Sequence, residues 1–254
     1  MEPIVSNRSE ITVVGSSIMH VKNLRKTAEW YSELLSMPLN NFDESTPFYE
    51  FDMSNHVNLM LDDHRNMPQE KYPIYMLKTN DIDRSYAFVK DADIPVVLEI
   101  QRPHPGLSYF NVEDSEGNVL MITQSDWVNP SPVVPSNPDH PVKNHIRSIV
   151  VPVQNLKRAT EWYSNLLNQP IKPERVDGGP IYWFDMENGT GILLDDNRNN
   201  TDLSDYPTLM LRAENIKEAY QFLVDKGADI VRDIQFDHYF MVKDIEGNMI
   251  MICA

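Results

Sequence analysis

Residues 23–35 read NLRKTAEWYSELL, and residues 155–167 read NLKRATEWYSNLL. The two stretches match at most positions, and Leu24 and Leu156 occupy equivalent places in them. An internal repeat of this kind indicates that one structural unit occurs twice along a chain. The repeat therefore predicts the domain organisation before any local pattern is considered.

Shorter matches on the C-terminal side of these stretches keep nearly the same spacing. They pair FDM at 51–53 with 184–186, LDD at 61–63 with 194–196, and EGN at 116–118 with 246–248. Because the spacing changes by only a few residues between matches, the differences are explained by loops of unequal length. We predict two homologous domains, at residues 10–124 and 145–254.

The segment between the repeats, residues 125–144, is rich in proline. Its prolines are Pro130, Pro132, Pro135, Pro138 and Pro141. Proline lacks a backbone N–H and fixes φ, so this density disfavours helix and favours extended backbone. We interpret residues 125–144 as a connector between the two domains.

The composition limits the classes of partner. The chain has 254 residues, 41% of them hydrophobic, which is typical of a folded globular protein. It carries 22 Lys and Arg against 38 Asp and Glu, a formal net charge of −16. An acidic surface is repelled by nucleic acid and by anionic membranes, so neither is expected as a partner.

The cysteine content and the N-terminal residues bear on location. Cys253 is the only cysteine, so no intrachain disulfide can form. The first residues, MEPIVSNRSEITVVG, lack the pattern of a secretory signal, and no apolar run approaches the length of a membrane-spanning helix. These observations predict a cytoplasmic protein.

Within each repeat the hydrophobic period switches between that of a strand and that of a helix. In the first repeat, strands are predicted at 13–21, 48–53, 57–61, 74–77, 109–112 and 119–123, and helices at 27–35 and 82–89. The last two strands flank the turn at 114–118, where Gly117 can adopt positive φ. The order is β-α-β-β(-β) twice per repeat, and it recurs from Val150 onward.

This order resembles that of the vicinal oxygen chelate superfamily, which includes glyoxalase I, extradiol dioxygenases and bleomycin-resistance proteins. The resemblance rests on the Asn-Leu-x₆-Tyr entry to the first helix and the Asp-x-x-Gly-Asn turn before the last strand, each present twice. It implies an α+β fold with tandem glyoxalase-like domains. Each domain would contain two βαβββ modules that form an open, cup-shaped mixed sheet with helices outside.

Metal-dependent members of that superfamily carry His, Glu or similar ligands at four positions facing the cup. The resemblance places these positions on Ser16, Met60, Ile74 and Met121 in the first domain, and on Ser148, Leu193, Thr208 and Met251 in the second. No residue of this set is His, Asp or Glu, and thioethers do not suit the metals of this chemistry. We therefore expect no metal at these positions, and no cofactor.

Candidate ligand-binding residues follow from the same alignment. A methionine-rich cup would suit a small, partly apolar organic molecule. The predicted ligand-binding residues are Ser16, His20, Met60, Asp62, Arg65, Met121, Ser148, Asp195, Arg198, Thr208 and Met251. An alternative interpretation is that the methionines only fill a vestigial cavity.

Each polar candidate also has a structural interpretation. The segments at 61–66 and 194–199 place two acidic residues before an arginine. An arginine there could hold a ligand with its guanidinium, or it could close a turn whose Asp accepts from backbone amides. His20 is suited to acid–base chemistry near neutral pH, but Pro152 takes its place in the second repeat.

The sequence predicts a small-organic-molecule binding protein of the glyoxalase/bleomycin-resistance type without the family metal site. One alternative is a metal-dependent lyase, isomerase or dioxygenase with displaced ligands, and a second is a non-catalytic scaffold. No catalytic residue is assigned. Since the repeat supplies two similar units in one chain, we expect a monomer that acts as a pseudo-dimer, or a weak homodimer.

Overall fold

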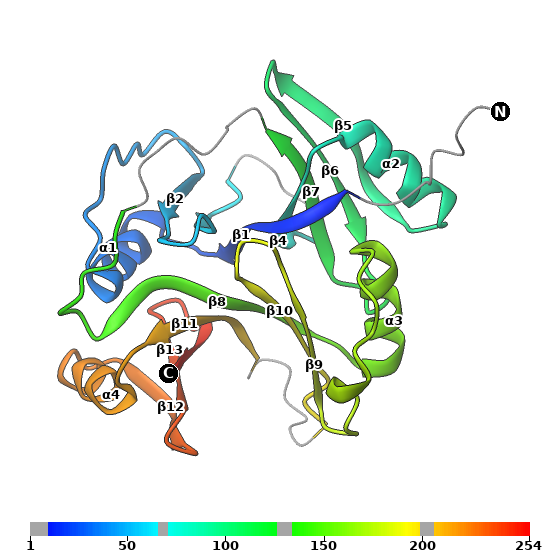
Figure 1. The fold of residues 1–254 in the computed structure, drawn as a ribbon. Coiled ribbons are helices and arrows are strands. Elements are labelled where there is room, and N and C mark those ends of the chain that lie inside the picture. The colour runs from blue at the N-terminus through cyan, green and yellow to red at the C-terminus, as the bar shows by residue number, and fades with distance from the viewer. Residues whose placement is uncertain (1–9, 66–70, 126–133, 199–205) are drawn as a thin grey trace.

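The structure is a computed structural model that describes residues 10–65, 71–125, 134–198 and 206–254. Two seven-stranded sheets form its framework, sheet A from the first half of the chain and sheet B from the second (Figure 1). Their strand orders are β2-β3-β1-β4-β7-β6-β5 and β9-β10-β8-β11-β14-β13-β12, so equivalent strands occupy equivalent places in the two sheets. Each copy of the repeated sequence therefore forms one seven-stranded sheet.

Sheet A and its helices are built from residues 11–125. Its strands are β1 (Ile11–His20), β2 (Phe48–Asp52), β3 (Asn58–Asp62), β4 (Pro73–Thr79), β5 (Val96–His104), β6 (Leu107–Glu113) and β7 (Val119–Ser125). Its helices are α1 (Leu24–Leu35) and α2 (Ile82–Asp91). Strand β1 pairs parallel with β3 and antiparallel with β4, so the sheet is mixed.

Sheet B repeats this arrangement. Its strands are β8 (Val142–Pro152), β9 (Ile181–Asp185), β10 (Gly191–Asp195), β11 (Pro207–Ala213), β12 (Asp229–Gln235), β13 (Tyr239–Lys243) and β14 (Met249–Cys253). Its helices are α3 (Leu156–Leu166), the short 3-10 helix η1 (Pro173–Arg175) and α4 (Ile216–Asp225). The tandem α+β fold with two open mixed sheets is as predicted.

The structure adds to the predicted elements in two places. Strand β5 was not among the predicted strands, because its outer half, which includes Pro103, is exposed and shows no apolar alternation. Strand β8 includes residues 142–144, which the sequence analysis placed in the connector. In the described residues the first module of sheet A contains three strands, and the second contains four.

Helices α1 and α3 begin at equivalent asparagines for a local reason. The Asn23 side chain accepts a hydrogen bond from the Lys26 amide, and the Asn155 side chain accepts one from the Arg158 amide. This is the usual N-cap interaction, which satisfies one of the free amides of the first turn. The Asn-Leu motif of the repeat is thus a helix-start signal.

Each half of the chain completes the first helix of the other half. Glu246 accepts a hydrogen bond from the backbone amide of Asn23, at 2.9 Å. In the equivalent place, Glu116 accepts from the amides of Gln154 and Asn155, at 2.8 and 3.1 Å. In a capping box the glutamate comes from the helix itself, whereas here it comes from the β-turn of the other half.

The same two turns receive buried tyrosine hydroxyls. Tyr31 of α1 donates to Asp244 at 3.1 Å, and Tyr163 of α3 donates to Asp114 at 2.9 Å. Tyr75 of β4 donates in turn to the Tyr163 hydroxyl at 2.6 Å. Both Tyr31 and Tyr163 are fully buried in the core, and their hydroxyls also join the two halves.

The two faces of each sheet differ in burial. One face packs against helices and holds the large buried side chains, such as Leu59, Leu77 and Phe110 of sheet A. The other face alternates with it along every strand, and many of its residues are only half-buried, for example in β3, β4 and β10. We call this second face the concave face, and the concave faces of sheets A and B the first and the second cup, after the shape that the family resemblance implies.

Candidate functional site

The strand register brings the four family positions of the first domain onto the concave face of sheet A. Ser16 lies opposite Met76 on β4, and Met76 lies opposite Met121 on β7. Met60 lies opposite Ile18, which is two residues from Ser16 and therefore on the same face. Ile74 shares its face with Met76 in the same way. The four positions thus line one concave surface.

Sheet B brings its four positions together by the same register. Ser148 lies opposite Met210 and Gly191, and Met210 lies opposite Met251. Leu193 lies opposite Val150 on the same face. Thr208 faces this surface too, and its hydroxyl is 2.9 Å from the sulfur of Met19, a residue of sheet A. The four positions of each domain therefore share one face of one sheet, and the second set also contacts the other half of the chain through Thr208.

The donor set at these positions does not fit the divalent metals of the family. It consists of hydroxyls, thioethers and aliphatic side chains, whereas such metals take carboxylate or imidazole ligands. Within residues 10–65, 71–125, 134–198 and 206–254, no three or more His, Cys, Asp or Glu side chains are grouped so that they could hold a metal. The side chains at the family positions can instead offer a ligand apolar contact and hydroxyl hydrogen bonds.

Glu50 adds a carboxyl group to the first cup. It lies opposite Met60, so it shares the concave face, and burial raises its pKa above the usual range. Asn58, Lys78 and Ser16 lie close enough to oppose this effect by stabilising the carboxylate. Lys78 crosses β1 at Gly15, where a Cβ atom would approach its side chain to 3.1 Å.

Glu50 was missed in the sequence analysis, although a signal was present. In Phe-Tyr-Glu-Phe-Asp the buried Phe51 marks the covered face, so alternation places Glu50 on the other one. The register-equivalent residue in sheet B is Trp183, which is 37% exposed. The two cups therefore differ at this position, a carboxyl group in the first and an indole in the second.

Asn111 adds a buried amide group to the first cup. Asn111 lies opposite Met121 and is 2% exposed. Its side-chain oxygen is buried without a hydrogen-bond partner in the described residues. Buried polar atoms are normally paired, so this amide is a group that a ligand could satisfy.

His20 lies beside a second histidine at the end of β1. Its Nδ1 is in contact with Nε2 of His64, and the His64 ring stacks on Tyr72 with 3.5 Å between centroids. The other ring nitrogen of His64 is 3.4 Å from the Asp62 carboxylate. Burial and the neighbouring His64 lower the pKa of His20 to about 4, so it is neutral near pH 7.

The sequence analysis identified His20 as a candidate but did not identify its partner, His64. His64 reaches His20 because its backbone has positive φ, 54°, which turns the chain back toward β1. The equivalent residue in the second half, Asn197, has φ of 41° and makes the same turn without an imidazole. The His20 Nε2 atom is buried and has no hydrogen-bond partner in the described part of the chain, as is the case for the Asn111 oxygen.

The remaining polar candidates are engaged in the turns that follow β3 and β10. Asp62 and Asp195 accept from the amides of His64 and Asn197, at 2.8 and 2.7 Å. Arg198 binds the Asp196 carboxylate and donates to the Gly178 carbonyl at 2.8 Å. These contacts agree with the turn-closing interpretation of the repeated acidic-arginine segments.

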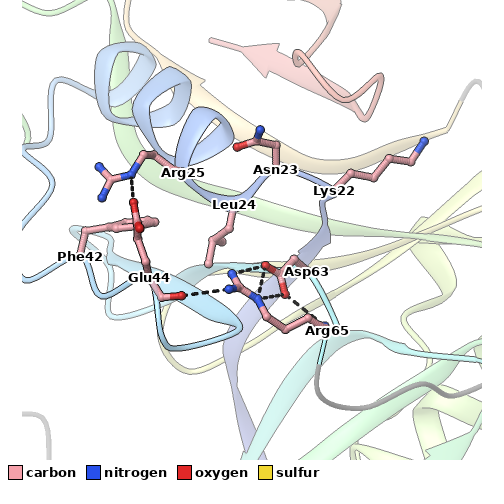
Figure 2. A pocket seen from close by; sticks show the side chains of 8 residues that line it. All are labelled: Lys22, Asn23, Leu24, Arg25, Phe42, Glu44, Asp63 and Arg65. Atoms are coloured by element: carbon pink, nitrogen blue, oxygen red, sulfur yellow. Dashed lines mark hydrogen bonds and ion pairs between the residues drawn. The ribbon is translucent and has the colours of Figure 1, made fainter.

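Arg65 makes the equivalent contacts beside the start of α1. Figure 2 shows its guanidinium between Asp63 and the Glu44 carbonyl, to which it donates at 2.9 Å. These residues line a surface hollow of about 460 Å³, where Arg25 also pairs with Glu44. Apart from Lys22, the charged side chains that line this hollow are paired with one another.

The fold and the repeated helix and turn motifs define the class of this protein. The chain belongs to the Glyoxalase/Bleomycin resistance protein/Dioxygenase superfamily, whose sequence model matches residues 14–122 and 144–252. No curated protein matches the chain in sequence.

Solved structures with the same fold include dioxygenases and a Mn(II)-bound glyoxalase. An extradiol ring-cleaving dioxygenase from B. fuscum has a TM-score of 0.63 at 14% identity, over 98% of this chain and 73% of that one. The 2,3-dioxygenase LapB from Pseudomonas sp. KL28 gives 0.61 at 11% identity, over 96% and 92%. A Mn(II)-bound glyoxalase from Novosphingobium aromaticivorans gives 0.57 at 15% identity, over 96% and 82%. At these identities the likeness concerns the fold alone.

Proposed function

We propose that this protein binds a small, partly apolar organic molecule on its concave faces, without a metal at the four family positions of either sheet. The observation that carries the proposal is the lining of these faces. Met60, Met76 and Met121 are only half-buried on the concave face of sheet A, whereas apolar residues on its covered face are fully buried. Flexible thioethers beside a few polar groups are typical of ligand sites.

The polar groups at the first cup support the same proposal. Burial raises the pKa of Glu50 even though Asn58, Lys78 and Ser16 stabilise its carboxylate. The Asn111 oxygen is buried with no hydrogen-bond partner in the described residues, so burying each of these groups carries a cost. A core that only fills space would not retain them. A ligand that donates hydrogen bonds would offset this cost.

The test is to place a bulky residue at Met121. In an open cup, Met121→Trp is expected to change the free energy of unfolding by less than about 1 kcal/mol, and to abolish binding of aromatic fragments seen with wild type. Met251→Trp is the matched variant in the second cup. A scaffold with filled cups would instead lose about 1–3 kcal/mol through overpacking and bind no fragment.

A metal-dependent enzyme with displaced ligands is the second candidate, and the His20–His64 pair is the observation that favours it. Its two facing nitrogens offer two ligands, with Asp62 behind His64. We expect elemental analysis after exposure to Zn²⁺, Mn²⁺ or Fe²⁺ to find no stoichiometric ion. One retained ion per chain that is lost in His64→Ala would promote this alternative over the first.

The proposal includes a cytoplasmic location and a monomeric state. In the described residues, no helix has the length and apolarity needed to cross a membrane. Sedimentation is expected to give a monomer or a weak dimer, since each half already covers the equivalent surface of the other. An obligate dimer would contradict this part of the proposal.

A further inference from the structure

The arginines of this acidic protein fall into two groups. Most of those in the described ranges form an ion pair with a carboxylate: Arg25, Arg65, Arg84, Arg102, Arg158, Arg175 and Arg198. Arg147, Arg212 and Arg232 form none there, although the chain contains 38 acidic residues. All three are exposed, and all three lie on strands of sheet B.

Two of the unpaired arginines converge on one point. The Arg147 guanidinium is 4.0 Å from the sulfur of Cys253 and donates to the backbone oxygen of Ala254 at 2.8 Å. Arg212 lies directly opposite Cys253 in the register of β11 and β14. Both guanidiniums also act on His145 and lower its pKa together with burial. The two positive charges therefore share one end of the second cup.

The register connects this cationic end to the methionine-lined surface. Ser148, next to Arg147, begins a row across the sheet that continues through Met210, Met251 and Met241. Arg232 lies opposite Met241, at the far end of this row. An apolar surface is thus flanked by guanidinium groups on both sides.

The first cup provides an internal comparison. At the register-equivalent positions it has Gly15 for Arg147, Lys78 for Arg212 and Leu98 for Arg232, and it contains the Glu50 carboxyl. The arginines are therefore not a requirement of the shared scaffold. They belong to the second cup alone.

We propose that the second cup binds a small organic anion. Arg147 and Arg212 hold its carboxylate or phosphonate group, and its apolar body lies on Met210 and Met251. Guanidinium forks match the geometry of both kinds of oxyanion. Arg212 has neither an ion pair nor a hydrogen bond in the described residues, and Arg147 uses one nitrogen for Ala254, so both retain N–H groups for a ligand. This inference rests on the proposed function and names the ligand class for one of its two sites.

The experiment measures binding of matched probes to the full chain by calorimetry or ligand-observed NMR. Phenylacetate and phenylphosphonate carry an anion on an aromatic body, benzyl alcohol and benzylamine carry a neutral and a cationic group on the same body, and inorganic phosphate carries no apolar body. We expect one or both organic anions to bind, and to bind more tightly than the other three. Their relative affinity distinguishes the carboxylate from the phosphonate.

Variants locate the site. Arg212→Ala is expected to raise the Kd of the preferred anion about tenfold or more, and Arg212→Lys to raise it less. Arg212 makes no hydrogen bond in the described residues, so its loss is not expected to unfold the protein. Arg102→Ala, which removes an exposed arginine from sheet A, is the control and should leave the Kd unchanged.

The outcomes separate this inference from the proposed function. If benzyl alcohol or benzylamine binds as tightly as the anions, and Met251→Trp removes that binding, the cup is a ligand site but its anion preference is wrong. An unchanged Kd for the anion in Arg212→Ala also overturns the inference. If no probe binds either cup at millimolar concentration, the inference and the proposed function both fail.

Discussion

Replacing Tyr163 by phenylalanine tests how strongly the buried hydroxyl chain joins the two halves of the protein. The Tyr163 hydroxyl donates to Asp114 at 2.9 Å and accepts from Tyr75 at 2.6 Å. Tyr163→Phe keeps the ring and removes both hydrogen bonds. The Tyr75 hydroxyl and one oxygen of Asp114 each lose a partner in the protein interior.

The expected cost follows from the kinds of bond that are lost. A hydrogen bond to a charged group contributes about 1.5–3 kcal/mol, and one between neutral groups about 0.5–1.5 kcal/mol. Tyr163→Phe should therefore lower the free energy of unfolding by about 2–4 kcal/mol. Tyr31→Phe is the matched variant, because Tyr31 donates to Asp244 but accepts from no second tyrosine in the hydrogen bonds described. Its cost should be smaller by about 1 kcal/mol.

Urea unfolding followed by tryptophan fluorescence measures both costs. Trp30 and Trp162 lie next to the two tyrosines, with ring centroids 4.8 Å away in each case, so they report on these positions. Equal costs for the two variants would refute the contribution of Tyr75. Costs below about 0.5 kcal/mol for both would refute the view that these hydroxyls join the halves.

Two further predictions concern titrating groups. The pKa of His20 is about 4, below its unfolded value of 6.5, so the stability that this group contributes is complete above pH 6.5 and is lost as the pH falls toward 4. The free energy of unfolding should therefore depend less on pH in this range in His20→Gln than in wild type. A variant of the exposed His104 is the control, and its pH dependence should equal that of wild type. Hydrogen bonds from Arg158 and from the backbone of Gln154 and Asn155 lower the pKa of Glu116, even though burial acts in the opposite direction. Glu116→Gln should therefore lower the free energy of unfolding by about 1–3 kcal/mol at pH 7, and this difference from wild type should shrink below the unfolded-state pKa of about 4.3. A difference that persists at pH 3 would show that packing, and not charge, is the cause.

Local signals in the sequence were sufficient for most of the framework. The N-cap asparagines, the alternation in the central strands and the Asp-x-x-Gly-Asn turns depend on residues near one another in the chain, so they can be interpreted from short segments. The repeat then places two such units in one protein. Strand β5 was missed although Val96, Leu98 and Ile100 alternate with more exposed residues, because the alternation is confined to its first half and the rest of the strand is exposed.

The polar features of the site depended on contacts between distant segments. Tyr31 and Asp244 are 213 residues apart, and their hydrogen bond exists only because of the way the halves pack. The approach of His64 to His20 required positive φ at a residue that is not glycine. Glu50 could have been placed on the concave face by alternation, but its interactions with Asn58, Lys78 and Ser16 depend on how three other strands pack beside it.

The reciprocal helix capping has a consequence for how the chain can assemble. Glu116 and Glu246 each act on the half of the chain that does not contain them, so the contacts are the same whether the two halves belong to one polypeptide or to two. Two chains that exchanged their halves would form a domain-swapped dimer with every one of these contacts retained. The equilibrium between the closed monomer and the swapped dimer then depends on the effective concentration of one half around the other, which the connector sets. A connector too short to let the halves of one chain meet would favour the dimer.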